Sequence, residues 1–302
     1  MTNKKVIIIG SGPAGITASI YLKRSGMEPY LIESYMPGGK LSSTYKIDNY
    51  PGFDSINGSD LAFKMMDQLT KNQIDIHYET VTSVIKKNDK IIVESSVDSY
   101  QTEAVIIASG MTEKKLNIKS EDKFLAKGIS FCAICDGGFY KNQPMAIIGG
   151  GNSALEEALY LKDLANPLYI IHRRNEFRGD QLVLDQVKES DKIKIMTPYV
   201  PVEFKGEEVL DSLVLENVET KEQIEINVKG VFEYVGSIPN TSFVNNKEIL
   251  NEQGFIEVDD KMMSKIPGIF AAGDVIKKDL RQVVTATNDG AIAAMAVKSY
   301  LK

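Results

Sequence analysis

The chain has 302 residues, which is long for a single hydrophobic core and comfortable for two domains. Its formal net charge is −6, and its acidic and basic residues are interspersed, which argues against a general affinity for nucleic acid or for an anionic membrane. Every apolar run is shorter than the roughly 20 residues that a membrane span needs. We therefore expect a cytoplasmic protein.

The first apolar stretch leads directly into a glycine turn. Val6–Gly10 is too short for the core of a signal peptide and is expected to be a buried strand. A helix is expected up to Arg24, and a second strand over Pro29–Glu33. A strand, a glycine turn and a helix in this order predict the opening of a dinucleotide-binding unit. The residues of the turn are Gly10, Ser11, Gly12, Pro13, Ala14 and Gly15.

Glu33 stands at the end of the second strand, where such units bind the adenosine ribose. A carboxylate there accepts hydrogen bonds from the ribose hydroxyls and repels a 2′-phosphate. The first unit is therefore predicted to bind FAD or NAD. Further strands are expected around the turn at Asn88 and Asp89 and over residues 100–108, and residues 111–119 are interpreted as a crossing into a second domain.

Cys132 and Cys135 form a C-x-x-C motif that is followed by Asp136. A disulfide across so short a loop restricts the unfolded chain little, and structural disulfides are rare in reducing cytosol, so a redox-active pair is favoured over a structural disulfide or two inert thiols. Asp136 can exchange a proton with these sulfurs, or it can cap the following turn. With only two histidines in the chain, His77 and His172, no metal site is expected.

A second strand, glycine turn and helix begins at Met145, and its turn contains Gly149, Gly151, Asn152, Ser153 and Ala154. No acidic residue ends the strand that follows. Four basic or ionisable residues stand there instead: His172, Arg173, Arg174 and Arg178. Guanidinium groups suit an extra phosphate, so this second unit is predicted to bind NADPH. The alternative is a solvated basic loop.

The C-terminal part returns to the first domain. After a second crossing at residues 236–242, a strand ends at Gly273, and a long Ala-rich helix begins near Arg281. Asp274 can accept hydrogen bonds from ribityl hydroxyls, and the helix N-terminus can face the flavin. The expected fold class is α/β with two Rossmann-like domains. Residues 1–112 and 243–302 form a split FAD domain, and residues 113–242 form an inserted NADPH domain that carries the dithiol.

These signatures, in this order over nearly the whole chain, resemble the low-molecular-weight bacterial thioredoxin reductases. The resemblance rests on residues 10–15, 49–52, 132–137, 149–154, 172–178, 271–275 and 281–282. It implies a homodimer that uses FAD and NADPH to reduce thioredoxin or a thioredoxin-like dithiol protein. It extends the expected FAD contacts to Ser34, Gly39, Lys40, Leu41, Asn49, Ala108, Gly110, Gly273, Asp274, Arg281, Gln282 and Val283.

The resemblance also implies individual roles. Cys135 lies against the flavin and receives its electrons, Cys132 attacks the thioredoxin disulfide, and Asp136 donates a proton. A rotation of the NADPH domain alternates the two electron transfers. The chain departs from the family at Lys40, where a glutamine is usual, and at Gly138, where an aromatic residue is usual.

Two enzymatic alternatives share these features. One is a relative that reduces another disulfide protein, and the other is a relative that takes its electrons from ferredoxin. The intact second glycine turn, together with Arg173 and Arg174, argues against the ferredoxin-dependent enzyme. A ferredoxin-NADP reductase of similar architecture lacks the dithiol. A non-enzymatic flavin-binding role would leave the dithiol without a purpose.

Overall fold

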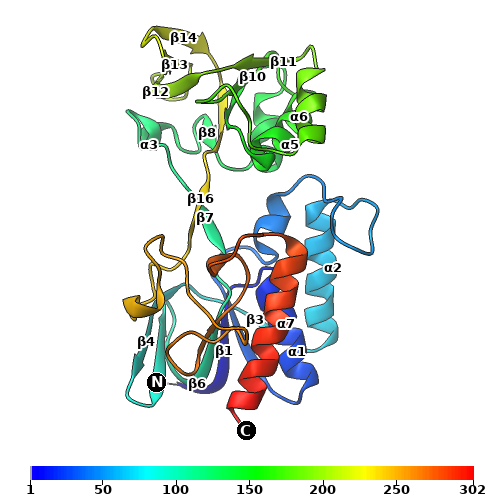
Figure 1. Ribbon diagram of the computed structural model, residues 1–302, viewed down its shortest axis with the longest axis vertical. Helices are drawn as coiled ribbons and strands as arrows, with labels where there is room; N and C mark the ends of the chain where they lie inside the picture. The colour runs from blue at the N-terminus through cyan, green and yellow to red at the C-terminus, as the bar shows by residue number, and fades with distance from the viewer. Residues whose placement is uncertain (1) are drawn as a thin grey trace. The chain divides into compact units, whose positions relative to one another are not determined.

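The computed structural model describes residues 2–302, which divide into two compact units (Figure 1). The first unit combines the chain up to Thr112 with Ile238–Lys302, and the second unit is Glu113–Ser237. Two short strands join them, β7 (Met111–Glu113) and β16 (Ser237–Pro239), and these pair with each other.

The first unit is built around a seven-stranded sheet in the order β3-β2-β1-β6-β5-β4, with β17 also paired to β6. The strands β1, β2, β3, β6 and β17 are parallel. Its helices and strands are β1 (Thr2–Ile9), α1 (Pro13–Arg24), β2 (Pro29–Glu33), α2 (Gly58–Lys71), β3 (Ile76–Tyr78), β4 (Val81–Lys87), β5 (Lys90–Ser95), β6 (Ser99–Ile107), β17 (Ile269–Ala271) and α7 (Val283–Tyr300).

Alternating apolar residues of β1 supply both faces of this sheet, as the period of a strand requires. Val6 and Ile8 pack in a core with residues of α1 and α7, whereas Ile7 and Ile9 pack in a second core with residues 243–276. Figure 1 shows α1 and α7 side by side. Burial on both faces explains why β1 reads as a continuous apolar run.

The second unit contains a five-stranded parallel sheet in the order β11-β10-β9-β15-β8, and a three-stranded antiparallel sheet, β12-β13-β14. Its helices and strands are α3 (Glu121–Phe124), β8 (Ile129–Ser130), α4 (Ala133–Asp136), β9 (Met145–Gly149), α5 (Asn152–Leu161), β10 (Leu168–Ile171), α6 (Gln181–Lys188), β11 (Ile193–Met196), β12 (Tyr199–Lys205), β13 (Ser212–Asn217), β14 (Gln223–Asn227) and β15 (Gly230–Tyr234).

The core of the second unit lies on both faces of β9. Met145 and Ile147 pack with residues of α5, while Ala146 and Ile148 pack with residues of the antiparallel sheet. Each unit thus has a strand, a glycine turn and a helix at its centre, and the predicted α/β class is confirmed. Within residues 2–302, none of the helices has the length and apolar character to cross a bilayer.

Candidate active site

The first glycine turn connects β1 to α1, and its glycines are required by the backbone. Gly10 has φ +100°, and a Cβ there would lie 2.4 Å from the carbonyl oxygen of Ala108. A Cβ on Gly15 would overlap the carbonyl oxygen of Gly10 at 1.8 Å. Gly12 is different, because a Cβ there would meet nothing within 4 Å. Gly12 also begins α1 without a side-chain cap, so no capping side chain occupies the N–H groups of the first turn, as a phosphate-binding turn needs.

Glu33 is buried and is bonded to the glycine turn. Its Oε2 accepts from the backbone N–H and the hydroxyl of Ser11, both at 2.8 Å, and its Oε1 accepts from the N–H of Tyr35 at 2.9 Å. The predicted ribose-binding carboxylate therefore also holds the turn in place. Each oxygen retains capacity for a further donor. Ser34, the next residue, is exposed.

The loop after β2 folds back onto the turn. The N–H of Gly38 donates to the carbonyl oxygen of Ser11 at 2.8 Å, and a Cβ on Gly39 would lie 3.3 Å from the Cα of Gly12. Lys40 is exposed, whereas Leu41 is buried in a small apolar cluster. The structure thus places Gly39, one of the expected residues of this loop, next to the glycine turn.

Asp274 lies in the 3-10 helix Gly273–Val275 that follows β17, and a Cβ on Gly273 would lie 2.9 Å from the Cβ of Ala14 at the start of α1. The Asp274 Oδ1 atom is buried and accepts no hydrogen bond within residues 2–302. Burial raises the pKa of Asp274, against the opposing charges of Lys278, Lys40 and Arg281. A buried acceptor without a hydrogen bond, beside the glycine turn, fits a ligand hydroxyl.

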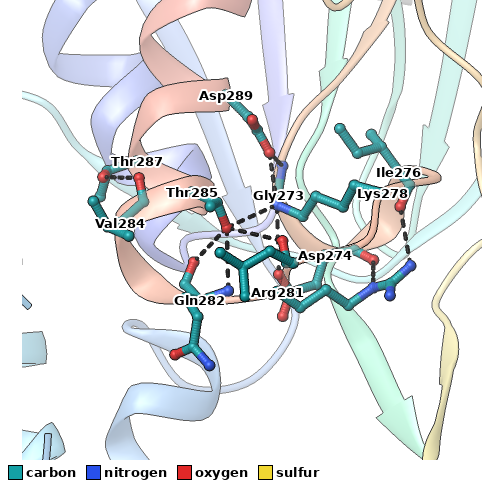
Figure 2. A network of polar contacts seen from close by, with 11 residues as sticks. Gly273, Asp274, Ile276, Lys278, Arg281, Gln282, Val284, Thr285, Thr287 and Asp289 are labelled. Carbon is teal, nitrogen blue, oxygen red and sulfur yellow. Dashed lines mark hydrogen bonds and ion pairs between the residues drawn. The ribbon is translucent and has the colours of Figure 1, made fainter. Parts of the chain in front are cut away.

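Lys278 links Asp274 to α7 (Figure 2). Its Nζ donates to Oδ2 of Asp289 at 2.7 Å and lies 3.8 Å from Oδ1 of Asp274. The side chains of Lys278 and Asp289 are only 13% and 8% exposed, so the pair is largely shielded from solvent. The same Asp289 oxygen accepts from the N–H of Gly273 at 3.2 Å. This ion pair therefore holds the Asp274 turn against α7.

The N-terminus of α7 is formed by residues that the sequence singled out. Gln282 and Thr285 form a capping box, and the Gln282 side chain accepts from Asn49 at 3.2 Å. The Arg281 guanidinium donates to the carbonyl oxygens of Asp274 and Ile276, each at 3.4 Å. Val283 begins the helix. Ala108 and Gly110 follow β6, whose neighbour β1 ends at the glycine turn.

The second glycine turn connects β9 to α5 and repeats the first. Gly149 has φ +157°, and a Cβ there would lie 2.9 Å from the Cβ of Ala154. A Cβ on Gly151 would meet nothing within 4 Å, and this residue begins α5 without a side-chain cap. Asn152 accepts from the N–H of Asp180 at 2.6 Å, and Ser153 is exposed in the first turn of α5. This turn also offers uncapped N–H groups to a phosphate.

Basic residues gather around the second turn. The His172 ring lies against Gly150, where a Cβ would come within 2.4 Å of it, and Arg178 donates its N–H to the carbonyl oxygen of Gly150 at 2.8 Å. Burial, followed by the charges of the nearby arginines, lowers the pKa of His172. Arg173, Arg174 and Arg178 are exposed and form no ion pair within residues 2–302. Their guanidinium groups are therefore available to an anion.

Cys132 and Cys135 form a disulfide at the start of α4, in the second unit. Cys132 is half-buried and Cys135 is exposed. The N–H of Cys135 donates to the Sγ atom of Cys132 at 3.2 Å. Asp136 ends the same short helix, and one of its carboxylate oxygens accepts from the hydroxyl of Ser130 at 2.6 Å. The structure thus places the predicted catalytic residues together.

Four residues of these networks were not predicted. Ser130 stands two positions before Cys132, and that proximity was the available signal. Asp289 gave a signal too, as an acidic residue inside an Ala-rich apolar helix. Tyr234 accepts from the N–H of Ala133 at 3.0 Å, and neither Tyr234 nor Lys278 has a local sequence signal. Across the part of the chain that the structure describes, no group of acidic residues, histidines and cysteines is arranged to hold a metal ion.

The comparison with known proteins agrees with this geometry. Residues 4–290 match the family described as pyridine nucleotide-disulphide oxidoreductase. A thioredoxin reductase of Ureaplasma parvum is 40% identical over 98% of this chain and 96% of its own length. The chain belongs to the thioredoxin reductase family of these oxidoreductases.

Other members of the family show the same extent of similarity. The thioredoxin reductase of Bacillus subtilis is 38% identical over 98% of this chain and 94% of its own length. The crystal structure of the Lactococcus lactis thioredoxin reductase superposes with a TM-score of 0.95 at 41% identity, covering 99% of each chain. The likeness therefore includes both units.

Proposed function

We propose that the protein is an NADPH-dependent thioredoxin-disulfide reductase, with FAD in the first unit, NADPH in the second, and the Cys132–Cys135 disulfide as the redox group that meets thioredoxin. The observation that carries this proposal is the disulfide itself, next to Asp136, in a chain with two glycine turns that each begin a helix without a side-chain cap. Membership of the thioredoxin reductase family supports the reaction and the partner.

The residues of the first unit fit FAD. Uncapped N–H groups beyond Gly12 would bind the pyrophosphate, and Glu33 would bind the adenosine ribose. The Oδ1 atom of Asp274, which accepts no hydrogen bond within residues 2–302, would accept one from a ribityl hydroxyl. When bound, the flavin supplies the conversion of a hydride from NADPH into an electron pair for the disulfide. The capped N-terminus of α7, at Gln282, would place its positive end toward the flavin ring.

The residues of the second unit fit NADPH rather than NADH. The open approach to Gly151 would admit the pyrophosphate, and the exposed guanidinium groups of Arg173, Arg174 and Arg178 would bind the 2′-phosphate. His172 is predominantly neutral at pH 7 because burial lowers its pKa, so its ring packs against the glycine turn without adding a charge. These features argue against a ferredoxin-dependent enzyme, which has no need of a 2′-phosphate site.

The dithiol step needs only groups in the second unit. The Cys132 thiolate attacks one sulfur of the thioredoxin disulfide, a mixed disulfide forms, and the other thioredoxin sulfur leaves with a proton from Asp136. The thiol of Cys135 then attacks the Cys132 sulfur and reforms the disulfide, while its proton passes to the second thioredoxin sulfur, so that dithiol thioredoxin is released. The N–H of Cys135 already donates to the Cys132 sulfur, and the same donor would stabilise the Cys132 thiolate.

The experiment is anaerobic mixing of the purified protein with NADPH and then with oxidised thioredoxin, followed by flavin absorbance. We expect NADPH to bleach the flavin and thioredoxin to restore it. Cys135→Ser should keep its flavin and still be bleached by NADPH, but should lose thioredoxin turnover. Full activity of that variant would refute the dithiol assignment. We also propose that the protein is a cytoplasmic homodimer. Sedimentation analysis of the purified protein tests the dimer.

A further inference from the structure

The hydroxyl of Ser130 connects the backbone of Cys132 to the carboxylate of Asp136. Its Oγ accepts from the N–H of Cys132 at 3.0 Å and lies 2.6 Å from Oδ2 of Asp136. The remaining neighbour, the carbonyl oxygen of Cys132, is 3.4 Å away. Since the N–H of Cys132 occupies a lone pair of Oγ, the hydroxyl proton is free to point toward Asp136, which is the shorter and charged contact. One side chain therefore fixes both the nucleophilic cysteine and the acidic residue.

The sheet of the second unit holds Ser130 in this position. Ser130 is only 7% exposed and ends β8, where it pairs with Phe232 of the central neighbour β15. Phe232 is fully buried in the core beneath α5. A short serine side chain on a paired strand has little freedom to move. One partner of the Asp136 contact is therefore held by the sheet and not by the C-x-x-C turn itself.

We propose that Ser130 is a positioning residue that holds the Asp136 carboxyl group as the proton carrier of thiol–disulfide exchange. This inference rests on the proposed function. Asp136 takes the proton of the attacking thiol of Cys132 and gives it to the thiolate that leaves the substrate disulfide. It then takes the proton of Cys135 and gives it to the second leaving thiolate. Two sulfur–sulfur bonds are exchanged, two electrons and two protons reach the substrate, and no outside acid is required.

This role makes the benefit of Ser130 depend on the leaving group. A basic aliphatic thiolate leaves slowly unless it is protonated, whereas an acidic aromatic thiolate leaves without a proton. If Ser130 merely stabilised the fold, its loss would slow both reactions alike. If it positions a proton carrier, its loss slows the reaction with the basic leaving group much more than the reaction with the acidic one, because only the basic leaving group also needs a proton from Asp136. The chemistry of the substrate therefore separates the two roles.

The test uses the purified flavin-loaded protein, reduced with dithiothreitol, freed of excess reductant and mixed without NADPH. The probes are bis(2-hydroxyethyl) disulfide, which releases an aliphatic thiol, and dithiobis(nitrobenzoate), which releases an aromatic one. Oxidation of Cys132 and Cys135 is followed by rapid alkylation and mass measurement. Ser130→Ala removes the hydroxyl and Ser130→Thr keeps it. Ser212→Ala is the matched control, because the Ser212 hydroxyl donates to Glu225 at 2.5 Å in the antiparallel sheet.

We expect Ser130→Ala to react about tenfold more slowly with the aliphatic disulfide and within about twofold of wild type with the aromatic one. Ser130→Thr should recover most of the loss, and Ser212→Ala should match wild type with both probes. Equal slowing with both probes, or no slowing with either, would overturn the proposal. Because these reactions need neither NADPH nor thioredoxin, failure of thioredoxin turnover in the wild-type protein would contradict the proposed function alone.

Discussion

The hydroxyl of Tyr234 accepts a hydrogen bond from the N–H of Ala133, at 3.0 Å, and so ties the residue after Cys132 to the end of β15. Tyr234 pairs with Gly149 in the parallel sheet, at the strand end where the second glycine turn begins. The Tyr234 side chain thus links α4, the helix at the disulfide, to β15, which is the neighbour of the strand that leads into the second glycine turn. Ala133 is fully buried, so its N–H has no access to water as a substitute partner.

Tyr234→Phe should lower the free energy of unfolding by about 2 kcal/mol, because it leaves the buried N–H of Ala133 without an acceptor. Urea unfolding followed by circular dichroism measures this change. Tyr140→Phe is the control, since Tyr140 is partly buried in the same core and its hydroxyl forms no hydrogen bond within residues 2–302. A loss for Tyr140→Phe as large as that for Tyr234→Phe would attribute the effect to packing instead.

Lys278→Met should destabilise the first unit by about 3 kcal/mol, because the buried Asp289 and the half-buried Asp274 would lose their shared cation. The neighbouring Lys277→Met is a matched control. Lys277 is 67% exposed, and its ion pair with Glu257 at 3.5 Å lies at the surface, where such pairs contribute little. Thermal unfolding of the two apoproteins should separate them clearly. If both variants unfolded at the same temperature, the network of Lys278, Asp289 and Asp274 would not be holding the Asp274 turn.

The glycine turns could be predicted because their requirement is local. Gly10 and Gly15 leave no room for a Cβ, and the apolar strands on either side of them have the expected period, so the α/β fold was predicted correctly. Tyr234 and Ala133 are 101 positions apart and meet only because β15 lies between β8 and β9. Side-chain partners set by strand order in this way cannot be predicted from the pattern of a single segment. The ligand roles of the predicted site residues stay predictions.

Replacing Arg173 and Arg174 with alanine should raise the KM for NADPH at least about tenfold and change the KM for NADH little. Both side chains are exposed and form no ion pair within residues 2–302, so the fold should not suffer. Steady-state kinetics with the two nucleotides measures the ratio. Arg24→Ala, on the last turn of α1 in the first unit, controls for the loss of a surface cation. An equal effect on both nucleotides would remove the case for a 2′-phosphate site.

Because of Glu157, we expect the free energy of unfolding to fall as the pH rises toward 8. It lies on α5, 6% exposed, and its Oε2 accepts no hydrogen bond within residues 2–302. Burial, and then the charge of Glu156, raises the pKa of Glu157 from 4.5 to about 8. The folded state therefore holds a proton that the unfolded state has already released above pH 4.5. The stability that this proton contributes is complete below pH 4.5 and declines until the pH reaches about 8.

Glu157→Gln cannot titrate, so its free energy of unfolding should fall less between pH 5 and pH 8 than that of the wild-type protein. Part of the slope should remain, because burial also raises the pKa of Glu233 on β15 to about 8. Urea unfolding at a series of pH values measures both slopes. Glu156→Gln, which removes only the smaller cause of the raised pKa of Glu157, should reduce the slope less than Glu157→Gln does. Parallel slopes for Glu157→Gln and wild type would show that Glu157 is ionised in the folded protein.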